Sequence, residues 1–339
     1  MLIAEERTSE HWAGSLPSLS IVIPTHSHAA FLPELMTSLE KQTMPRESFE
    51  VIVVDDASTD STWEVLSGLV NATPLRMRAA RADHNVGPGS TRNAGVTLAR
   101  GHVLAFTDDD CLPSTVWAEE LARAVTDGLD LVQGRTLPQP RTPQGPWDRY
   151  VWVTGSTPLF ESCNLAVSRI AFEEAGGFPT ARPDATRGTR SHFGEDVEIG
   201  WKIRNAGRRT GYSASALVHH RMIPGRYADW LAEQRRMGLF PGLVRRVPGL
   251  RRELLRLGVF LSANTARFDL AVAGVTLAAV SGRPWVAAAG LPWLRRRWRE
   301  ATARPGRTRL ARLAQYALGD GLGLVSLVAG SVRDRRLVL

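Results

Sequence analysis

Three consecutive aspartates, Asp108, Asp109 and Asp110, directly follow the apolar segment formed by residues 102–107. Like charges this close together repel one another unless a cation shares the site. Carboxylate oxygens select the hard divalent ions Mg²⁺ or Mn²⁺, which usually complete their coordination shell with substrate phosphates. The same residues would also suit a solvated acidic loop, or caps for a helix that starts near Ser114. The cluster alone leaves a metal site and a plain loop open.

A second acidic pair, Asp55 and Asp56, ends the apolar run of residues 50–54. In an open parallel sheet, ligands bind beyond the carboxyl ends of the strands, so we expect both acidic clusters at one edge. A carboxylate there can accept a hydrogen bond from a nucleobase N–H or a ribose hydroxyl. Helix capping is the alternative, although Ser58 and Asp60 can supply that cap by themselves. The position in the predicted sheet favours ligand binding.

Residues 84–95 form a glycine-containing turn that opens a helix. The segment Gly87-x-Gly89 approaches the dinucleotide fingerprint but fails as one, because Arg92 occupies the third glycine position and the turn follows the third strand instead of the first. A turn of this kind, with an arginine in the first turns of its helix, can still hold an anion such as a diphosphate. A plain turn is the alternative.

Two further groups could take part in catalysis. Glu195 and Asp196 open a helix after the long polar loop of residues 179–192. A carboxylate near an acceptor hydroxyl can act as a general base, but acids at a helix N-terminus also stabilise the helix dipole. His219 and His220 follow a short apolar strand, and such a pair is more often structural, although an imidazole can complete a metal shell. Spacing alone decides neither case.

Apolar runs and helical spacings alternate in the first third of the chain. Strands are expected at residues 19–24, 50–56, 75–80 and 102–107, and helices at residues 29–42, 59–69 and 90–99. Short, continuous apolar runs are typical of buried parallel strands, and apolar residues spaced three and four apart are typical of helices. The alternation predicts an α/β fold with an open, mostly parallel sheet flanked by helices.

The chain has 339 residues, of which 43% are hydrophobic and 22% charged, a composition that excludes wholesale disorder and fibrous proteins. Two cysteines cannot build a disulfide framework, and residues 1–18 lack the layout of a signal peptide. We therefore expect a cytoplasmic protein. The charge is divided unevenly: residues 1–240 carry 24 basic and 29 acidic side chains, whereas residues 241–339 carry 18 arginines and 5 acids.

The C-terminal part is rich in Leu, Ala, Val and Gly, with arginine clusters such as residues 295–297. Its longest uncharged runs, residues 270–282, 284–294 and 321–332, are shorter than the roughly 18 to 20 residues that a spanning helix needs, which predicts no transmembrane helix. Apolar faces flanked by arginine suit helices that lie at an anionic membrane surface or pack on the preceding domain. The few aromatic residues of this part argue against nucleic-acid binding.

Three parts are expected along the chain. Residues 1–18 form an N-terminal tail, residues 19–238 an α/β domain, and residues 239–339 an Arg-rich apolar helical region that is associated with a membrane interface.

Five motifs, taken in order, resemble those of the family 2 glycosyltransferases of the GT-A fold, of the bacterial, non-processive type. They lie at residues 21–25, 53–60, 85–95, 106–110 and 194–196. The resemblance implies a GT-A domain with an appended α-helical region. It also implies a metal-dependent, inverting enzyme of hexosyltransferase type, which moves one sugar from a nucleotide-diphosphate sugar to a hydroxyl.

The resemblance also implies roles for individual residues. The nucleoside would lie against Pro24, Thr25 and Asp56, with Asp55 beside them and Arg92 near the diphosphate. Asp108 and Asp110 match the two acids of the DxD motif, the first nearer the ribose and the second on the metal. Asp109 lies between them and is expected, like Asp108, to bind the nucleotide sugar.

Two roles concern the end of the domain. Asp196 matches the catalytic base of inverting members. His220, and less closely His219, matches a histidine that helps to bind the metal or the phosphate. The ion expected from the resemblance is Mg²⁺ or Mn²⁺, with Asp110, Asp108 and His220 as its protein ligands.

One departure separates this chain from the processive synthases, which carry Gln-x-x-Arg-Trp after the base. Residues 233–238 read Glu-Gln-Arg-Arg-Met-Gly, without the tryptophan, so transfer of a single sugar is expected. The expected acceptor is a cell-envelope or lipid-linked saccharide at the inner face of the cell membrane. Two alternatives remain, a nucleotide-sugar-binding protein without turnover and a nucleotidyltransferase, which would release pyrophosphate.

Overall fold

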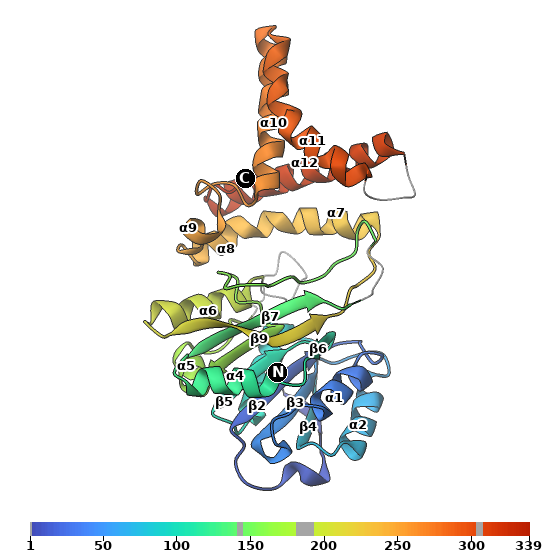
Figure 1. The fold of residues 1–339 in the computed structure, drawn as a ribbon, viewed down its shortest axis with the longest axis vertical. Coiled ribbons are helices and arrows are strands. Elements are labelled where there is room, and N and C mark those ends of the chain that lie inside the picture. The colour runs from blue at the N-terminus through green and yellow to red at the C-terminus, as the bar shows by residue number, and fades with distance from the viewer. Residues whose placement is uncertain (1, 141–144, 181–192, 303–307) are drawn as a thin grey trace. The chain divides into compact units, whose positions relative to one another are not determined.

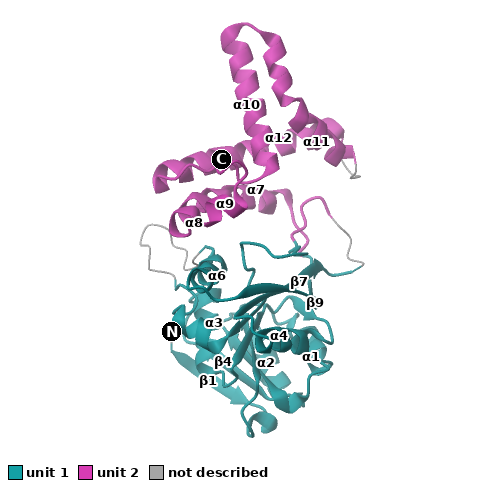
Figure 2. Ribbon diagram, turned by 60° about the vertical axis from the view of Figure 1, so that its left-hand side comes forward, with its two compact units in different colours: residues 1–142, 150–222 teal, residues 143–149, 223–339 magenta. Residues whose placement is uncertain are grey.

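The computed structural model describes residues 2–140, 145–180, 193–302 and 308–339 (Figure 1). The chain divides into two compact units, which Figure 2 shows in different colours. Unit 1 comprises residues 1–142 and 150–222, and unit 2 comprises residues 143–149 and 223–339. The predicted α/β domain corresponds to unit 1, and the predicted helical region to most of unit 2.

Unit 1 is built on a nine-stranded sheet with the strand order β1-β4-β3-β2-β5-β8-β7-β9-β6. The strands are β1 (Ile3–Thr8), β2 (Leu19–Thr25), β3 (Phe49–Asp55), β4 (Met77–Ala82), β5 (Val103–Thr107), β6 (Cys111–Pro113), β7 (Leu131–Pro138), β8 (Asn164–Ser168) and β9 (Thr210–His220). Strands β2 to β5 pair in parallel, as do β7 and β9, and the remaining pairs are antiparallel.

The predicted α/β fold is confirmed. All seven residues of β3 and six of the seven in β2 are buried, which explains why these strands read as continuous apolar runs and not as alternating ones. The flanking helices are α1 (Leu32–Glu40), α2 (Thr62–Ala72), α3 (Pro88–Leu98), α4 (Trp117–Thr126), α5 (Arg169–Glu174) and α6 (Glu195–Asn205). A Cβ on Gly95 of α3 would lie 2.4 Å from Val22 Cγ1, so glycine lets this helix approach the sheet closely.

The N-terminal residues differ from the expected tail. Residues 3–8 form β1, which pairs with β4 at the edge of the sheet, with Glu6 2.7 Å from Arg78. Trp63 Nε1 donates to Glu5 at 3.1 Å. Charged side chains are common on edge strands, where they discourage pairing with other chains. Because β1 carries such side chains, it does not form an apolar run, and the sequence did not predict it as a strand.

Unit 2 contains the appended helices α7 (Tyr227–Arg236), α8 (Phe240–Arg246), α9 (Leu250–Leu254), α10 (Ala263–Ser281), α11 (Leu291–Thr302) and α12 (Arg309–Asp334), with the 3-10 helices η3 (Met237–Leu239) and η4 (Pro284–Gly290). This unit includes residues 143–149, and its continuous C-terminal part begins at residue 223, whereas the expected boundary lies at 239. The reason is an aromatic cluster of Trp147, Tyr227, Trp230 and Tyr316, which ties α7 to α12.

No spanning helix is expected from the sequence, and one helix of the structure has the length and composition of a candidate. Among the described residues, α12 is long and apolar enough to cross a membrane, although a third of its most apolar stretch is buried inside the structure. Arg312 and Asp320 interrupt the uncharged runs of this helix, but both are buried, and Asp320 is paired with Arg297. Charges that are compensated within the fold therefore hid the length of the apolar helix.

Candidate active site

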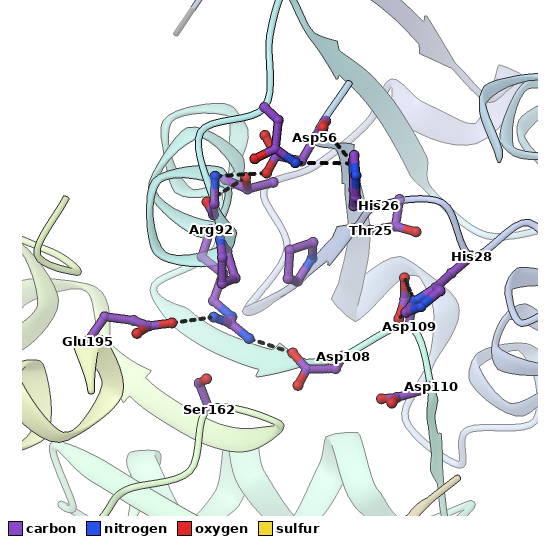
Figure 3. A pocket seen from close by; sticks show the side chains of 15 residues that line it. Thr25, His26, His28, Asp56, Arg92, Asp108, Asp109, Asp110, Ser162 and Glu195 are labelled. Carbon is purple, nitrogen blue, oxygen red and sulfur yellow. Dashed lines mark hydrogen bonds and ion pairs between the residues drawn. The ribbon is translucent and has the colours of Figure 1, made fainter. Parts of the chain in front are cut away.

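A cavity of about 630 Å³ opens beyond the carboxyl ends of β2, β3 and β5 (Figure 3). The two acidic clusters thus meet at one edge of the sheet, as the strand pattern predicted. The lining residues are Pro24, Thr25, His26, His28, Asp56, Asn85, Gly87, Pro88, Thr91, Arg92, Asp108, Asp109, Asp110, Ser162 and Glu195.

Thr25 and Asp56 form the wall contributed by β2 and β3. Thr25 lines the cavity, and its buried hydroxyl has no hydrogen-bond partner among the described residues, so its hydrogen-bonding capacity is unused. Asp56 accepts hydrogen bonds from the backbone N–H groups of Val86 and Gly87, both at 2.8 Å. Gly87 has φ +86°, which a side chain would disfavour. Asp56 therefore fixes the glycine turn beside the cavity.

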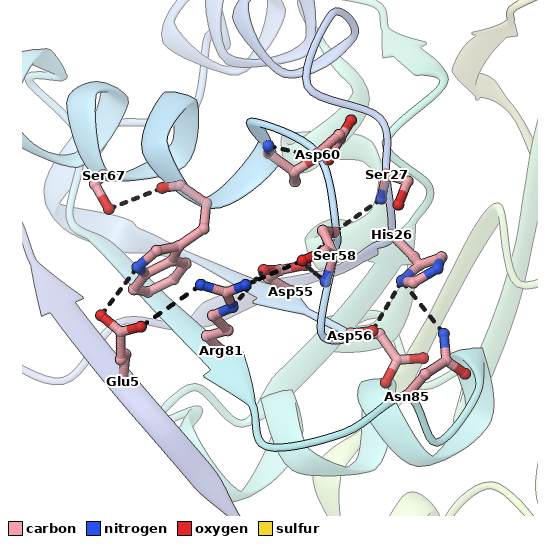
Figure 4. Close-up of polar contacts among 12 residues, drawn as sticks. Glu5, His26, Ser27, Asp55, Asp56, Ser58, Asp60, Ser67, Arg81 and Asn85 are labelled. Atoms are coloured by element: carbon pink, nitrogen blue, oxygen red, sulfur yellow. Dashed lines mark hydrogen bonds and ion pairs between the residues drawn. The ribbon is translucent and has the colours of Figure 1, made fainter.

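Asp55 does not line the cavity, which departs from its expected place beside the nucleoside (Figure 4). Its carboxylate is fully buried, accepts from the Ser58 backbone N–H at 3.0 Å and from the Ser58 hydroxyl, and lies 3.4 Å from Arg81 Nε. Burial raises the pKa of Asp55, and the Ser58 and Arg81 contacts oppose that rise. Ser58 Oγ in turn accepts from the Ser27 N–H at 2.8 Å. Asp55 thus braces the loops after β2 and β3.

Arg92 is a buried cation in the wall of the cavity, 4% exposed. Its Nη2 lies 2.5 Å from Asp108, and its Nη1 lies 3.8 Å from Glu195. Burial lowers the pKa of Arg92, but Asp108 and Glu195 outweigh it and the net shift is upward. Among the described residues, Nε and Nη1 of Arg92 have no hydrogen-bond partner. The guanidinium is therefore charged, and two of its nitrogens make no hydrogen bond in this part of the structure.

His28 was missed by the sequence analysis. Its Nδ1 lies 2.9 Å and 3.0 Å from the two carboxylate oxygens of Asp109, which is itself buried. This hydrogen bond raises the pKa of His28 against the opposing effect of its burial. Asp109 faces the cavity as expected, but in a pair with an imidazole. His28 follows β2 at the same edge as the aspartates, and this position was the available signal.

His26 was also missed, and it lies at the other end of the same turn. Its Nδ1 is 2.8 Å from the Asp56 carbonyl oxygen and 3.2 Å from Asn85 Nδ2 (Figure 4). The imidazole thus links the loop after β3 to the glycine turn. Ser162, which lies outside every motif of the sequence, also lines the cavity, as does Glu195 from the motif of residues 194–196.

Asp110 and His220 come together at the edge of the sheet. The antiparallel pairing of β6 with β9 sets Cys111 opposite His220, and His220 Nε2 lies 3.5 Å from Asp110 Oδ1. Burial raises the pKa of Asp110 to about 6, although His220 opposes the rise. Asp110, Cys111 and His220 offer ligand atoms within 4.8 Å of one another.

These donors fit a divalent cation. A carboxylate and an imidazole are ordinary ligands of Mn²⁺. Burial raises the pKa of the Cys111 thiol well above its usual range, which keeps it a poor ligand for a hard ion. Asp108, expected to be a metal ligand, is not part of this group and pairs with Arg92 instead. His219 lies 3.4 Å from the Pro138 carbonyl oxygen and does not line the cavity.

Asp196 lies in the first turn of α6, next to Glu195. Its Oδ2 accepts from the Ser162 N–H at 3.4 Å, and Ser162 lines the cavity, whereas Asp196 itself does not. Burial, reinforced by the charge of Glu195, raises the pKa of Asp196 to about 7. A carboxylate with this pKa can take up a proton near neutral pH. Most of the loop of residues 179–192 that precedes α6 lies outside the described residues.

Comparison with known proteins identifies the first part of the chain. Residues 20–182 match the family model described as glycosyl transferase family 2. Glycosyltransferase AglE from Haloferax volcanii is 26% identical over 235 residues, which are 66% of this chain and 73% of that protein. The poly(ribitol-phosphate) beta-glucosyltransferase of Bacillus spizizenii is 30% identical over 168 residues, which are 45% of this chain but only 26% of that protein.

Two solved structures share the fold. A mannosyltransferase from Pyrobaculum calidifontis, PcManGT, determined in complex with GDP-Man and Mn²⁺, aligns with a TM-score of 0.54 at 20% identity and covers 95% of this chain and 88% of that one. Residues 1–349 of Staphylococcus aureus TarS, in complex with UDP-GlcNAc, align with a TM-score of 0.51 at 16% identity, over 94% and 92% of the two chains. Residues 20–182 therefore form a glycosyltransferase family 2 domain, and the chain shares the GT-A fold of these structures.

Proposed function

We propose that this enzyme moves one sugar from a nucleotide-diphosphate sugar to a hydroxyl of a cell-envelope or lipid-linked saccharide, with a divalent metal ion and with inversion at the anomeric carbon. The observation that carries the proposal is one cavity that is lined by Thr25 with its unpartnered hydroxyl, by the buried Arg92 and by Asp110, whose carboxylate lies 3.5 Å from His220. The complexes of PcManGT with GDP-Man and of TarS with UDP-GlcNAc support a nucleotide-sugar donor.

The donor would lie along three of these groups. Thr25 Oγ1 and Asp56 would receive the nucleoside, because one is an unpartnered buried hydroxyl and the other a fixed carboxylate. Arg92 would bind the diphosphate through the nitrogens that Asp108 leaves free. Asp108 would then turn towards the ribose as Arg92 takes up the phosphate charge.

Asp110 and His220 would hold Mg²⁺ or Mn²⁺, and the Mn²⁺ in the PcManGT complex supports this assignment. The ion supplies positive charge where the nucleoside diphosphate departs. Arg92 provides the same kind of stabilisation from the protein itself, held in place by its buried position.

Asp196 would act as the base for the acceptor. As the acceptor oxygen bonds to the anomeric carbon, the bond from that carbon to the phosphate oxygen breaks, and the hydroxyl proton passes to the Asp196 carboxylate. Attack on the face opposite the leaving group inverts the anomeric centre. The raised pKa of Asp196, about 7, makes it a stronger base than an ordinary aspartate.

The acceptor and its location follow from charge and sequence. Residues 233–238 lack the tryptophan of processive synthases, which supports transfer of one sugar. The excess of arginine in residues 241–339 supports a position at the anionic inner face of the cell membrane, where lipid-linked acceptors are found.

The test is a panel of nucleotide sugars incubated with purified protein and Mn²⁺ or Mg²⁺, with and without a chelator. We expect metal-dependent release of a nucleoside diphosphate from one donor, and a transfer product whose anomeric configuration, determined by NMR, is opposite to that of the donor. Donor binding without release, even with a crude lipid extract as acceptor, would identify a binding protein. Release of pyrophosphate would identify a nucleotidyltransferase, and retained configuration would contradict the assignment of Asp196.

A further inference from the structure

From Leu270 to its end at Ser281, helix α10 is uncharged and apolar on every side, and most of these residues are exposed. Of its 19 residues only Ala271 and Gly274 are buried, whereas Val275, Leu277 and Val280 are 57%, 55% and 81% exposed. A helix without a polar face is normally covered, either by a protein core or by lipid. The exposed surface of α10 therefore needs a partner that can surround it.

The helix η4 covers the single buried face of α10. A Cβ on Gly274 would lie 2.8 Å from Ala289 Cβ, and one on Gly290 would lie 3.3 Å from Ala271 Cβ. Small residues let the two segments pack closely, as they do between helices in membranes. Residues 270–290 thus form a self-packed element, which we call the apolar hairpin, and Trp285 near its turn is 71% exposed.

A groove of about 1230 Å³ adjoins α11 and the start of α12, and we call it the basic groove. Arg267, Arg295, Arg296 and Arg299 line it together with apolar side chains such as Trp298. Its single acid, Glu300, pairs with Arg296 at 2.9 Å. In the part of the chain that the structure describes, no ion pair is found for the other three arginines.

We propose that the apolar hairpin enters one leaflet of an anionic bilayer while the arginines of the basic groove bind lipid phosphates. The inference rests on the membrane position proposed above and names the element responsible for it. Exposed apolar residues beside uncompensated arginines match a lipid surface, which offers hydrocarbon and negative charge within a few ångströms of each other. A protein partner would have to supply both features on one surface.

The dimensions of the hairpin limit how it can lie. Residues 270–281 are uncharged, and as a helix they extend about 18 Å, which is less than the hydrocarbon thickness of about 30 Å. Arg283 follows directly after the turn at Gly282, and its charge favours the level of the lipid headgroups. Trp285 prefers the same level. The hairpin therefore lies within the interface of one leaflet and does not cross the bilayer.

The first experiment measures co-sedimentation of the full-length chain with vesicles of phosphatidylcholine, with or without phosphatidylglycerol. We expect binding to anionic vesicles that weakens with salt, and an affinity about a hundredfold lower for neutral ones. Val280→Asp should lower the affinity at least about tenfold. Ile170→Asp is the matched control, because Ile170 is 65% exposed on α5 of unit 1. The pair Arg295→Gln and Arg299→Gln should remove most of the salt dependence.

A second experiment reports depth. Ser281→Cys can be labelled with an environment-sensitive fluorophore, because Cys111 and Cys163 are buried and do not compete for the label. The label should shift to shorter wavelength on anionic vesicles, and quenchers near the headgroups should quench it more than quenchers at the bilayer centre. Strongest quenching at the centre would instead mean deep insertion and would overturn the interfacial arrangement.

Other outcomes also decide the matter. Equal vesicle binding by Val280→Asp and the wild type would contradict the proposal. A dimer that depends on the apolar hairpin and does not bind vesicles would contradict it as well. Release of nucleoside diphosphate serves as an independent readout. Turnover without vesicle binding would overturn this inference and leave the catalytic proposal standing, whereas vesicle binding without turnover would do the reverse.

Discussion

Each unit of the molecule buries an arginine against two carboxylates, and the two clusters differ in how fully they are satisfied. In unit 2, Arg297 donates from Nε and Nη2 to Asp320 and from Nη1 to Glu300, and Asp320 also accepts from Trp293 at 2.7 Å. In unit 1, Arg92 bonds to Asp108 through Nη2, while its other nitrogens lack hydrogen bonds within the described residues. A saturated cluster stabilises a fold, whereas an incomplete one beside a cavity is prepared for a ligand.

The largest expected effect tests the site of unit 1. Asp110→Asn removes the charge that we assign to the metal, and we expect kcat/KM for sugar transfer to fall by roughly a thousandfold or more. Asp127→Asn, an exposed aspartate of the same unit, should leave the rate unchanged. Kinetics over a range of Mn²⁺ concentrations provide the measurement. A full rate for Asp110→Asn would remove Asp110 from the metal site.

A substitution in the arginine cluster of unit 2 should lower the stability of the fold. Arg297→Met leaves Asp320 buried without its partner, and we expect a loss of about 3–5 kcal/mol in the free energy of unfolding, measured with denaturant. The double variant Arg297→Met with Asp320→Leu should recover most of that loss, because no uncompensated charge remains. Donor hydrolysis should stay near the wild-type rate under conditions where the variant is folded. A stable Arg297→Met protein would contradict the structural role.

The corresponding substitution in unit 1, at Arg92, should lower the activity. Arg92→Met should reduce kcat by about a hundredfold to a thousandfold, since one fixed donor to the leaving group is lost. Its stability should fall less than that of Arg297→Met, because Asp108 is 29% and Glu195 15% exposed, so water can hydrate both carboxylates. Arg92→Lys keeps the charge and should recover part of the rate. An Arg92→Met enzyme with normal turnover and reduced stability would contradict this prediction, because the cluster of unit 1 would then only stabilise the fold, like the cluster of unit 2.

Asp196 should set the pH dependence. Its pKa of about 7 in the folded protein means that the free carboxylate, the form needed to accept a proton, increases as the pH rises through 7. We expect kcat/KM to rise about tenfold per pH unit below 7 and to level off above it. Because the folded pKa lies above the ordinary value of 3.8, Asp196 contributes stability that is present below pH 3.8 and is lost as the pH rises from there to about 7.

Asp196→Asn is the control for that profile and should be slow at every pH. An unchanged profile in this variant would assign the titration to another group.

The smallest expected effect concerns the loops behind the cavity. Ser58→Ala removes the hydroxyl that donates to Asp55 and accepts from the Ser27 N–H, and we expect a loss of about 1 kcal/mol in stability. Thermal unfolding measures it, with the exposed Thr37→Ala as a comparison. A large rise in the KM for the donor with unchanged stability would instead mean that the loop containing Ser58 contacts the donor.

The sequence predicted the edge of the sheet but not the direction of each side chain. Apolar runs and helical spacings are local, and they were sufficient to place both acidic clusters beyond the strand ends. Successive side chains of an extended segment point to opposite sides, so of Asp55 and Asp56 only one faces the cavity, and a motif does not say which. Asp108 is expected among the metal ligands from the motif that it matches, and its pairing with Arg92 could not be predicted because that contact depends on tertiary structure.

The remaining differences have similar causes. His28 and Ser162 reach the cavity from irregular segments, which carry no periodic signal. The early start of unit 2 depends on contacts between Trp147 and helices that follow it by some 80 residues or more. The length of α12 was hidden by two charged residues that the fold buries.

The pairing of β6 has a consequence for the synthesis of the protein. Strand β6 lies at the edge of the sheet and pairs with β9. Asp110 can therefore meet His220 only after the ribosome has synthesised a further 110 residues. While the chain leaves the ribosome, Thr25, Asp56 and Arg92 are available long before this strand closes the sheet. Assembly of the carboxylate–imidazole pair is therefore the step that marks completion of unit 1, and a nascent chain interrupted before β9 would carry Thr25, Asp56 and Arg92 without the Asp110–His220 pair.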